Sequence, residues 1–369
     1  MRRLLLAALA PATVAAVVWA YLVAIPGQFL IEHDTAPETG DWRAACSVPD
    51  ASTVGLPTGV TLALERAGET WVRTGAKAEY GVLSMPGCAV ARRELFFPGA
   101  RGGIGYVTAG GAAWYRLDPD GGGAFQHRLS TSVNPDPVIL RPPPGADYWS
   151  PILDVRAEAM AWIETQRGDD RAIVGHSIAV RALADGRTFR IALPLGPYSS
   201  PRLLDFNDRD GRFVVQRNYR EILTVGLDGR PLGEAIAPAG FESPGGNIRL
   251  LQGGWVAWDG YRENARHRVA WSLPQGKGLY EIPKGRGVTA VSVDPAGRYI
   301  AVSVTGNLSI GSVRDAVFVV RVADGAEVWR RYLTRYARSQ VAFLGAGYLA
   351  VTFVKDGTAR IDVLEVPAQ

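Results

Sequence analysis

The sequence predicts an all-β fold built from repeated antiparallel sheets. The pattern is clearest in residues 287–333, where four short runs of β-branched and aromatic residues are separated by turn residues. Pro295-Ala296-Gly297 separates the first two runs, and Ala323-Asp324-Gly325 separates the last two. One four-stranded sheet cannot bury both of its faces, so we expect sheets of the same kind on either side of it.

Related units recur along the chain. The turns that would join the third and fourth strands of successive units contain Gly121, Gly186, Gly229, Gly276 and Gly325. The last three intervals between these glycines are 43, 47 and 49 residues, close to the period of about 40–50 residues expected for the blades of a β-propeller. The sequence therefore predicts a propeller, in which sheets pack around a central axis.

The number of blades depends on how the ring closes. The final unit, residues 341–366, has three strands, so its sheet needs a fourth strand from elsewhere. Strand-like runs at residues 60–64, 70–72 and 80–83 are available, and joining the two chain ends in one sheet removes open edges. Five complete units and the closing one predict a six-bladed propeller. The surplus N-terminal strands leave a seven-bladed ring as the alternative.

One segment carries a resemblance to a known superfamily. Residues 291–302, Val-Ser-Val-Asp-Pro-Ala-Gly-Arg-Tyr-Ile-Ala-Val, resemble the repeat core of the WD-repeat and YVTN-type β-propellers. The resemblance covers roughly residues 92–366 and implies the fold. That superfamily contains scaffolds, receptors and several enzymes, so the resemblance does not imply an activity.

A second resemblance concerns one tryptophan. Asp324-Gly325-Ala326-Glu327-Val328-Trp329 resembles the tryptophan-docking repeat of quinoprotein dehydrogenases, where the motif recurs around the ring. Here one unit carries it. We therefore expect Trp329 to pack between neighbouring blades.

The N-terminus predicts a membrane anchor. Arg2 and Arg3 precede an apolar run, of which Leu4 to Ile25 alone is 22 residues, enough to cross a hydrocarbon core of about 30 Å. The leading positive charges favour a cytoplasmic N-terminus. The alternative is a cleaved signal peptide, but its apolar core is shorter, about 7–15 residues.

These features predict the domain organisation. We expect an uncleaved signal-anchor, a transmembrane helix, in residues 1–31, an extended tether in residues 32–58 and the propeller in residues 59–369. The protein would then cross the inner (cytoplasmic) membrane once, with its C-terminal domain periplasmic or extracellular.

The chain contains two cysteines, Cys46 and Cys88. In an oxidising compartment outside the membrane they can pair, so we predict a disulfide between them. The alternative is two unpaired cysteines that act as small hydrophobic residues.

Composition and spacing argue against several function classes. The net charge is +4 over 369 residues and no run of five or more basic residues occurs, so we expect no nucleic-acid partner. The four histidines are scattered singly, so we expect no metal and no other cofactor. Gly175-His176-Ser177 resembles a nucleophile elbow, but strand-forming residues follow where that motif needs a helix.

One set of residues has the character of a binding surface. Tyr-Arg pairs follow the second strand in two consecutive units, and two arginines occupy the comparable loop of the preceding unit. These loops would open on one face, and Tyr and Arg are enriched at interface hot spots. The candidate partner-binding residues are Arg167, Arg171, Tyr219, Arg220, Tyr261 and Arg262. The alternative is a solvated loop face with local ion pairs.

Two functions from different classes follow. The first is a membrane-anchored extracytoplasmic propeller that acts as a protein-interaction scaffold or as an accessory subunit of a membrane complex. The alternative is a propeller enzyme, a lactonase-like or glycan hydrolase or a degenerate quinoprotein-like protein, with its site at the central channel mouth. Because the sequence shows no catalytic set, it favours the first.

Overall fold

The computed structural model describes residues 42–50, 60–66, 69–74, 79–85, 87–94, 104–108, 111–119, 125–131, 138–143, 145–148, 152–153, 159–195, 201–207, 211–217, 221–232, 247–251, 253–259, 267–283, 286–306, 315–333, 339–344 and 347–368. All secondary-structure elements in these ranges are β-strands, which confirms the all-β prediction. The described strands form seven antiparallel sheets.

The first half of the chain supplies three sheets. Their strands are β2 (Val60–Arg66), β3 (Glu69–Thr74), β4 (Glu79–Ser84) and β5 (Ala89–Glu94); β6 (Ile104–Thr108), β7 (Gly111–Pro119), β8 (Phe125–Thr131) and β9 (Val138–Leu140); and β10 (Ala146–Tyr148), β11 (Ile152–Leu153), β12 (Ala159–Arg167), β13 (Ile173–Ala182) and β14 (Thr188–Leu193). In the third of these sheets β10 and β11 both pair with β12, so together they take the place of a first strand.

The second half supplies the other four sheets. Their strands are β15 (Arg202–Asn207), β16 (Arg212–Arg217) and β17 (Glu221–Val225); β18 (Asn247–Leu251), β19 (Gly254–Trp258), β20 (Arg268–Leu273) and β21 (Gly276–Glu281); β22 (Arg286–Val293), β23 (Tyr299–Gly306), β24 (Ala316–Arg321) and β25 (Glu327–Tyr332); and β26 (Gln340–Leu344), β27 (Tyr348–Lys355) and β28 (Thr358–Glu365) with β1 (Arg43–Val48).

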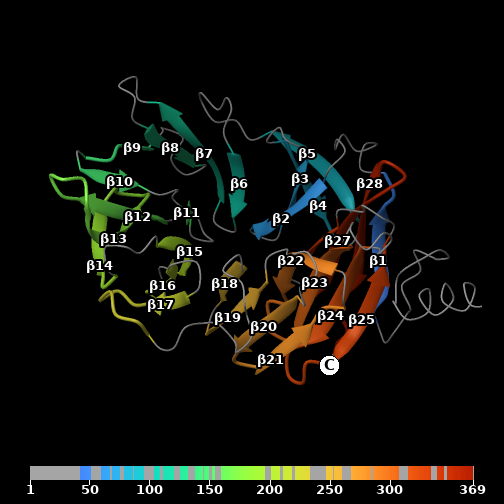
Figure 1. Cartoon of the computed structure of the whole chain (residues 1–369). Helices are drawn as coiled ribbons and strands as arrows, with labels where there is room; N and C mark the ends of the chain where they lie inside the picture. Colours follow the sequence, from blue (N-terminus) through green and yellow to red (C-terminus); the bar gives the residue numbers. More distant parts are fainter. Residues whose placement is uncertain are drawn as a thin grey trace, which may run out of the picture.

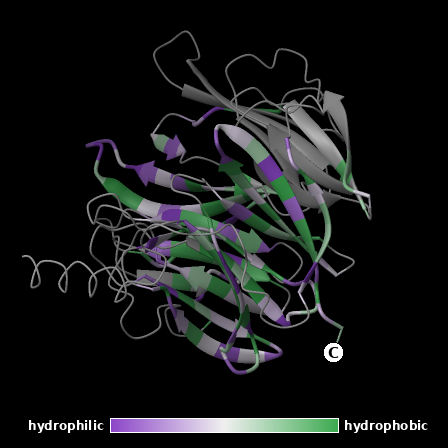
Figure 2. Cartoon of the chain, turned by 90° about the vertical axis from the view of Figure 1, so that its right-hand side faces the viewer, coloured by the Kyte–Doolittle hydropathy of each residue, from purple (hydrophilic) through white to green (hydrophobic). Residues whose placement is uncertain are grey.

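The sheets are arranged around a common centre (Figure 1). First strands of neighbouring sheets contact one another: β2 contacts β6 and β26, β15 contacts β18, and β22 contacts β26. Hydrophobic residues alternate with more polar ones along the coloured strands, and hydrophilic residues recur at the turns (Figure 2). This arrangement is the propeller architecture that the repeat pattern predicts.

The turn glycines are where the backbone requires them. Gly297 and Gly325 both have a φ of 72°, in the left-handed region that glycine adopts without a steric cost. The Gly297 N–H donates to the Asp294 carbonyl over 2.7 Å, and the Gly325 N–H donates to the Arg321 carbonyl over 2.9 Å. Both turns predicted within residues 287–333 are therefore confirmed.

The ring closes through an N-terminal strand, but a different one from the strands that the sequence offers. β1 pairs with β28 from Arg43 opposite Glu365 to Val48 opposite Ile361. The runs at residues 60–64, 70–72 and 80–83 instead lie in β2, β3 and β4 of their own sheet. β1 thus lies inside the range predicted as an extended tether. Its Arg-Ala-Ala-Cys-Ser-Val sequence looks like a linker because an outermost strand contacts a partner on one side and needs little hydrophobicity.

The predicted anchor, residues 1–31, lies outside the described residues. Within the part of the chain that the structure describes, no helix is long and apolar enough to cross a membrane.

Large apolar side chains fill the contacts between sheets. Trp271 on β20 is buried, and its Nε1 donates to the carbonyl of Val322, which follows β24 in the next sheet, over 3.1 Å. Trp329 on β25 is buried in a cluster with Tyr299, Leu349 and Trp42, and the Trp42 and Trp329 ring centroids are 6.3 Å apart. Trp329 therefore packs between two sheets, as its sequence context predicts.

Candidate functional site

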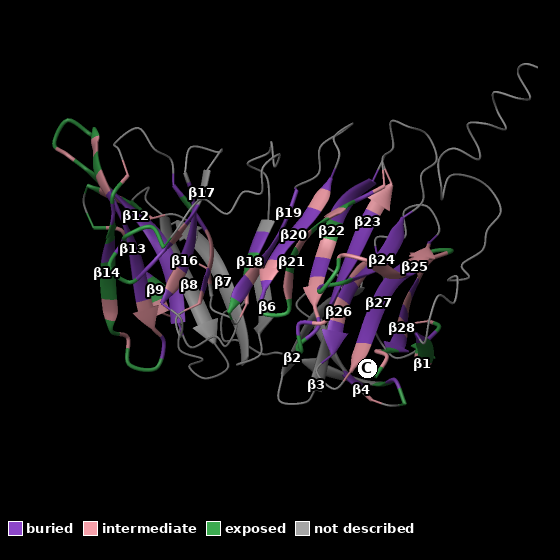
Figure 3. Cartoon of the chain, turned by 90° about the horizontal axis from the view of Figure 1, so that it is seen from below, coloured by how far each residue is buried: buried purple, intermediate pink, exposed green. Residues whose placement is uncertain are grey.

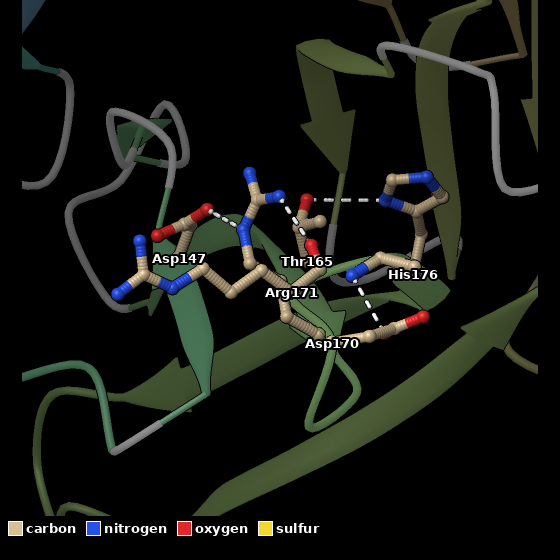
Figure 4. Close-up of polar contacts among 7 residues, drawn as sticks. Asp147, Thr165, Asp170, Arg171 and His176 are labelled. Atoms are coloured by element: carbon tan, nitrogen blue, oxygen red, sulfur yellow. Dashed lines mark hydrogen bonds and ion pairs between the residues drawn. The ribbon is translucent and has the colours of Figure 1, made fainter.

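The structure describes two of the candidate binding residues, Arg167 in strand β12 and Arg171 in the turn between β12 and β13. Arg167 ends β12, and its Nε donates to Asp147 Oδ2 on β10 over 2.6 Å (Figure 4). Its Nη1 donates to the carbonyl of Arg171 over 3.0 Å. The Arg167 guanidinium thus joins the first strand to the far side of the turn, which agrees with the alternative of local ion pairs for this residue.

The backbone of this turn is held by its own hydrogen bonds. The Gly168 N–H donates to the Ala172 carbonyl over 2.8 Å, and the Arg171 N–H donates to the Gly168 carbonyl over 2.9 Å. The Asp170 carboxylate accepts the Ala172 N–H over 2.9 Å (Figure 4). A short turn with this many internal bonds holds its side chains in a defined position.

Arg171 is the exposed residue of the turn. Its φ is 63°, a left-handed conformation that non-glycine residues seldom adopt. Among the described residues, its guanidinium forms no hydrogen bond or ion pair, whereas its carbonyl accepts from Arg167. The turn therefore presents a cationic side chain on an ordered backbone.

The turn belongs to a set of loops on one side of the molecule. β12, β16, β19, β23 and β27 are each the second strand of their sheets. The turn after β12 and the end of β23 both lie along the upper edge in Figure 3. Successive sheets repeat one topology, so β16 and β19 run toward the same side as β12.

The other four candidate residues, Tyr219, Arg220, Tyr261 and Arg262, lie in these two loops and outside the described residues. The strand ends that hold the loops are described. At the first loop, Arg217 and Glu221 are opposite each other in the backbone pairing of β16 with β17. At the second, the Arg268 N–H donates to Asp259 Oδ2 over 3.0 Å, and the Asp259 N–H donates to the Arg268 carbonyl over 3.1 Å. Their role in binding stays a prediction.

Buried polar residues lie beneath this side, and the sequence analysis does not single them out as a group. Thr165 and His176 face each other across β12 and β13, with 3.1 Å between Thr165 Oγ1 and His176 Nδ1 (Figure 4). Both are buried, as are Asp259 and His267 at the ends of the next loop but one. The sequence holds a signal for Asp259 and His267, which lie next to the largely apolar strands β19 and β20.

His176 and Ser177 lie inside the continuous strand β13. This confirms that Gly175-His176-Ser177 is part of a strand and not a nucleophile elbow. Among the described residues, no group of three or more His, Cys, Asp or Glu side chains is placed to hold a metal ion.

The Glu164 carboxylate on β12 is held by an arginine of the same sheet. Arg190 on β14 donates to Glu164 Oε2 through Nε over 2.7 Å and to Glu164 Oε1 through Nη2 over 3.1 Å. Such a bidentate pair is among the stronger ionic hydrogen bonds. Burial, and then the neighbouring Glu164 charge, raises the pKa of Tyr148 above its ordinary value.

A second polar network joins two neighbouring sheets. The Tyr280 hydroxyl on β21 donates to Glu327 Oε2 on β25 over 2.5 Å, and Arg330 Nε donates to Glu327 Oε1 over 2.6 Å. Arg330 Nη1 also donates to the Tyr332 hydroxyl over 2.9 Å. Burial raises the pKa of Tyr280, and the adjacent Glu327 carboxylate raises it further.

Arg286 completes this network. Its side chain is buried, and its guanidinium carbon lies 5.4 Å from the centroid of the Tyr332 ring. Burial lowers the pKa of Arg286 to about 10. The sequence gives no sign of this burial, because Gly285-Arg286-Gly287 reads as an exposed loop.

The predicted disulfide is confirmed: Cys46 in β1 is bonded to Cys88 in the turn between β4 and β5. No family model matches the sequence. No curated protein matches it either.

Comparison with solved structures returns β-propellers. An oligogalacturonate lyase in complex with manganese aligns with a TM-score of 0.49 and 10% identity over 87% of this chain and 96% of its own. The β-propeller domain of Cps50 (Swd1) from Myceliophteria thermophila aligns with a TM-score of 0.48 and 11% identity over 93% of this chain and 99% of its own. The WD40 domain of SCAP from fission yeast aligns with a TM-score of 0.43 and 8% identity over 84% of each chain. These solved structures resemble the chain in fold alone.

Proposed function

We propose that this chain is a membrane-anchored extracytoplasmic β-propeller that binds a protein partner through the side where the loops after the second strands open. The observation that carries the proposal is the turn between β12 and β13. It holds Arg171 exposed on a backbone fixed by its own hydrogen bonds. A preorganised side chain loses less conformational entropy on binding than a mobile one.

Sequence composition in the next two loops supports the same side. Tyr219-Arg220 and Tyr261-Arg262 follow the second strands of the two sheets after β10–β14. Tyr and Arg combine a large contact area with several hydrogen-bond donors. Three successive loops would then offer cationic and aromatic groups to one partner, whose complementary surface would be acidic.

The proposed anchor is residues 1–31, with the propeller outside the cytoplasm. The apolar N-terminal run and the leading Arg2 and Arg3 support this topology. The Cys46–Cys88 disulfide agrees with it, because disulfides persist in oxidising compartments.

We further propose that each of the seven sheets is one blade of a single closed ring, the alternative to the six-bladed arrangement. The three-stranded β15–β17 sheet would count as a full blade. Pro231 extends it by a single bridge to Val225, where a fourth strand would lie.

Charge reversal on the two sides of the same blades tests the binding side. The variant Arg171→Glu/Arg220→Glu changes two loops after second strands. The matched control Arg187→Glu/Arg230→Glu changes the turns after the third strands of the same two sheets, where both side chains are highly exposed, at 86% and 85%.

The intact protein is extracted from its native membrane in mild detergent, and co-purified proteins are quantified. We expect a stoichiometric partner with the wild type and with the control variant. Recovery should fall about tenfold or more with Arg171→Glu/Arg220→Glu, because like charges in an interface oppose association. Equal recovery with both variants would reject this side as the binding surface.

A further inference from the structure

The contact between the first and last sheets is where the chain ends meet. β1 is the first described strand, yet it belongs to the sheet of β26–β28, while β2–β5 form the neighbouring sheet. Every other sheet is built from strands adjacent in sequence. Among the described sheets, the closing sheet is therefore the one in which strands from distant parts of the chain pair with each other.

β1 has limited support from its own side chains. It is six residues long, and Arg43, Ala44 and Ser47 are exposed. It pairs with β28 alone, and the register shifts between Ala44 and Cys46. A short outermost strand near a chain end is the kind of element that opens locally at a low free-energy cost.

Two side chains near the two ends of β1 hold the strand against its neighbours. Trp42, just before β1, is 5% exposed and lies edge-on to the Tyr299 ring of β23, with centroids 5.4 Å apart. The Ser47 hydroxyl donates to Asp362 Oδ1 on β28 over 2.6 Å. Asp362 Oδ2 accepts from Arg331 Nη1 on β25 over 2.5 Å, so this carboxylate joins strands from two sheets.

The disulfide adds a connection of a different kind. Cys46 lies in the middle of β1, and Cys88 lies in the β4–β5 turn of the first sheet, 42 residues away in sequence. The bond thus crosses from the last sheet to the first. It sits in an apolar cluster drawn from both, which includes Val48, Leu83, Leu344, Ile361 and Val363.

The backbone at Cys88 adopts a conformation that surrounding structure must hold in place. Cys88 has a φ of 52°, in the left-handed region, and it is buried at 6% exposure. A residue with a Cβ adopts this conformation at a cost and keeps it where surrounding structure holds it there. The apolar packing and the bond to Cys46 supply that restraint.

We propose that the Cys46–Cys88 disulfide is the clasp that keeps the propeller ring shut, and that its reduction releases β1 while the other sheets stay folded. Reduction takes two electrons and two protons from an added dithiol, breaks the S–S bond and leaves two thiols, and the dithiol becomes a cyclic disulfide. Without the S–S bond, β1 keeps only its pairing with β28, the packing of Trp42 and the Ser47–Asp362 hydrogen bond, and we propose that these alone do not keep it from opening.

Amide hydrogen exchange on the full-length chain in mild detergent tests the clasp. Exchange is compared between the oxidised protein, the same protein after dithiothreitol, and the variant Cys46→Ser/Cys88→Ser. We expect residues 43–48, and those amides of residues 361–365 that donate to β1, to exchange about tenfold or more faster without the disulfide, while β23 and β24 keep their rates. Reduction in place keeps the test valid if the double variant fails to fold.

Two results would overturn the proposal. Unchanged exchange in β1 and β28 after complete reduction would show that packing alone holds the seam. An equal rise in all sheets would show that the disulfide stabilises the whole fold and not the closing strand.

A fourth sample, the variant Asp362→Asn, separates the effect of the disulfide from that of the hydrogen bonds around it. Asp362→Asn weakens the bonds from Ser47 and Arg331 and leaves the disulfide intact. We expect β1 in the oxidised variant to exchange more slowly than in the reduced wild type. If the oxidised variant exchanges as fast as the reduced wild type, the hydrogen bonds and not the disulfide form the clasp.

Discussion

Some glycines of this protein are required by close contacts between strands and others are not. Gly254 begins β19, and a Cβ built on it would lie 2.1 Å from the carbonyl oxygen of Ser272 on β20. Gly87, in the β4–β5 turn, has nothing within 4 Å of the equivalent position. The two positions make a matched pair for one substitution.

We predict that Gly254→Ala lowers the free energy of unfolding by about 1–3 kcal/mol, because the paired strands must separate to admit the methyl group. Gly87→Ala should change it by less than about 0.5 kcal/mol. Chemical denaturation of both variants checks this. Equal stabilities would mean that β19 and β20 adjust to a Cβ without cost.

The buried carboxyl group of Asp205 should make the free energy of unfolding depend on pH. Its carboxylate accepts the Phe206 N–H over 2.9 Å and the Leu250 N–H of the neighbouring sheet over 2.7 Å. Burial nevertheless dominates and raises the pKa of Asp205 above its ordinary value, although both hydrogen bonds and the Arg249 charge oppose the shift.

The direction of the pH effect on stability follows from the number of protons that the folded and unfolded states bind. Because the folded protein holds the Asp205 proton more tightly than the unfolded chain, the contribution of Asp205 to stability is present below the unfolded pKa and is lost as pH rises through the folded pKa. We expect the stability of the wild type relative to Asp205→Asn to fall between pH 3 and pH 7. Denaturation of both proteins across this range measures it, and a relative stability that rises would contradict the assignment.

At the scale of elements, ion pairs between strands differ in burial. Arg331 on β25 and Asp362 on β28 are 14% and 17% exposed, and Arg331 also lies 5.0 Å from the centroid of the Phe353 ring. Arg230 and Asp228, within one turn, are 85% and 62% exposed and 3.9 Å apart. The first pair joins two sheets, and the second joins none.

We predict that Arg331→Ala lowers the free energy of unfolding by about 2–3 kcal/mol, because it leaves the largely buried Asp362 carboxylate without its cation. Arg230→Ala should cost less than about 0.5 kcal/mol, as for other exposed pairs. Thermal or chemical unfolding of both variants compares them. A similar small loss in both would show that the β25–β28 contact does not depend on this charge pair.

How far the sequence predicts each element depends on where its stabilising contacts lie. The strands on either side of Pro295-Ala296-Gly297 have buried faces and a turn that fixes their pairing, so both are recovered from local pattern. The strand expected after Asp228-Gly229 is reduced to the single Val225–Pro231 bridge. Proline lacks an N–H and cannot extend a ladder, which the local turn signal does not reveal.

At the scale of the whole molecule, the proposed anchor makes a direct prediction. The full-length chain should stay with membranes after a high-pH wash. Replacing residues 1–31 with a cleavable export signal should release the propeller into the soluble extracytoplasmic fraction, because the apolar run supplies the membrane affinity.

Cell fractionation with detection of the C-terminal domain measures the outcome. Retention of the exported propeller on membranes would show that its surface or its partner holds it there. Release of the full-length chain by the wash would show that the N-terminal run does not anchor the protein, and release of a shortened chain would show that the run is cleaved.

The candidate binding side was only partly accessible to sequence reasoning. Repeat position places Arg167 and Arg171 in the loop after a second strand. The structure has Arg171 in that turn, whereas Arg167 is the last residue of strand β12. The structure also shows that the Arg167 side chain donates a hydrogen bond to Asp147, a residue 20 positions away on another strand. For Arg286 the sequence context is misleading. Its glycine neighbours suggest an exposed loop, but its side chain is buried and its guanidinium lies over the Tyr332 ring.

The sequence by itself determined the repeated antiparallel sheets, their turns and the pair of cysteines available for a disulfide. These depend on side-chain alternation and turn residues, which act over a few positions. Only the tertiary structure decided that β1 closes the ring, that the disulfide spans the first and last sheets, and that Arg286 is buried. Ser47 and Asp362 meet across 315 positions, and no local preference specifies such a partner because it arises from packing of the complete ring.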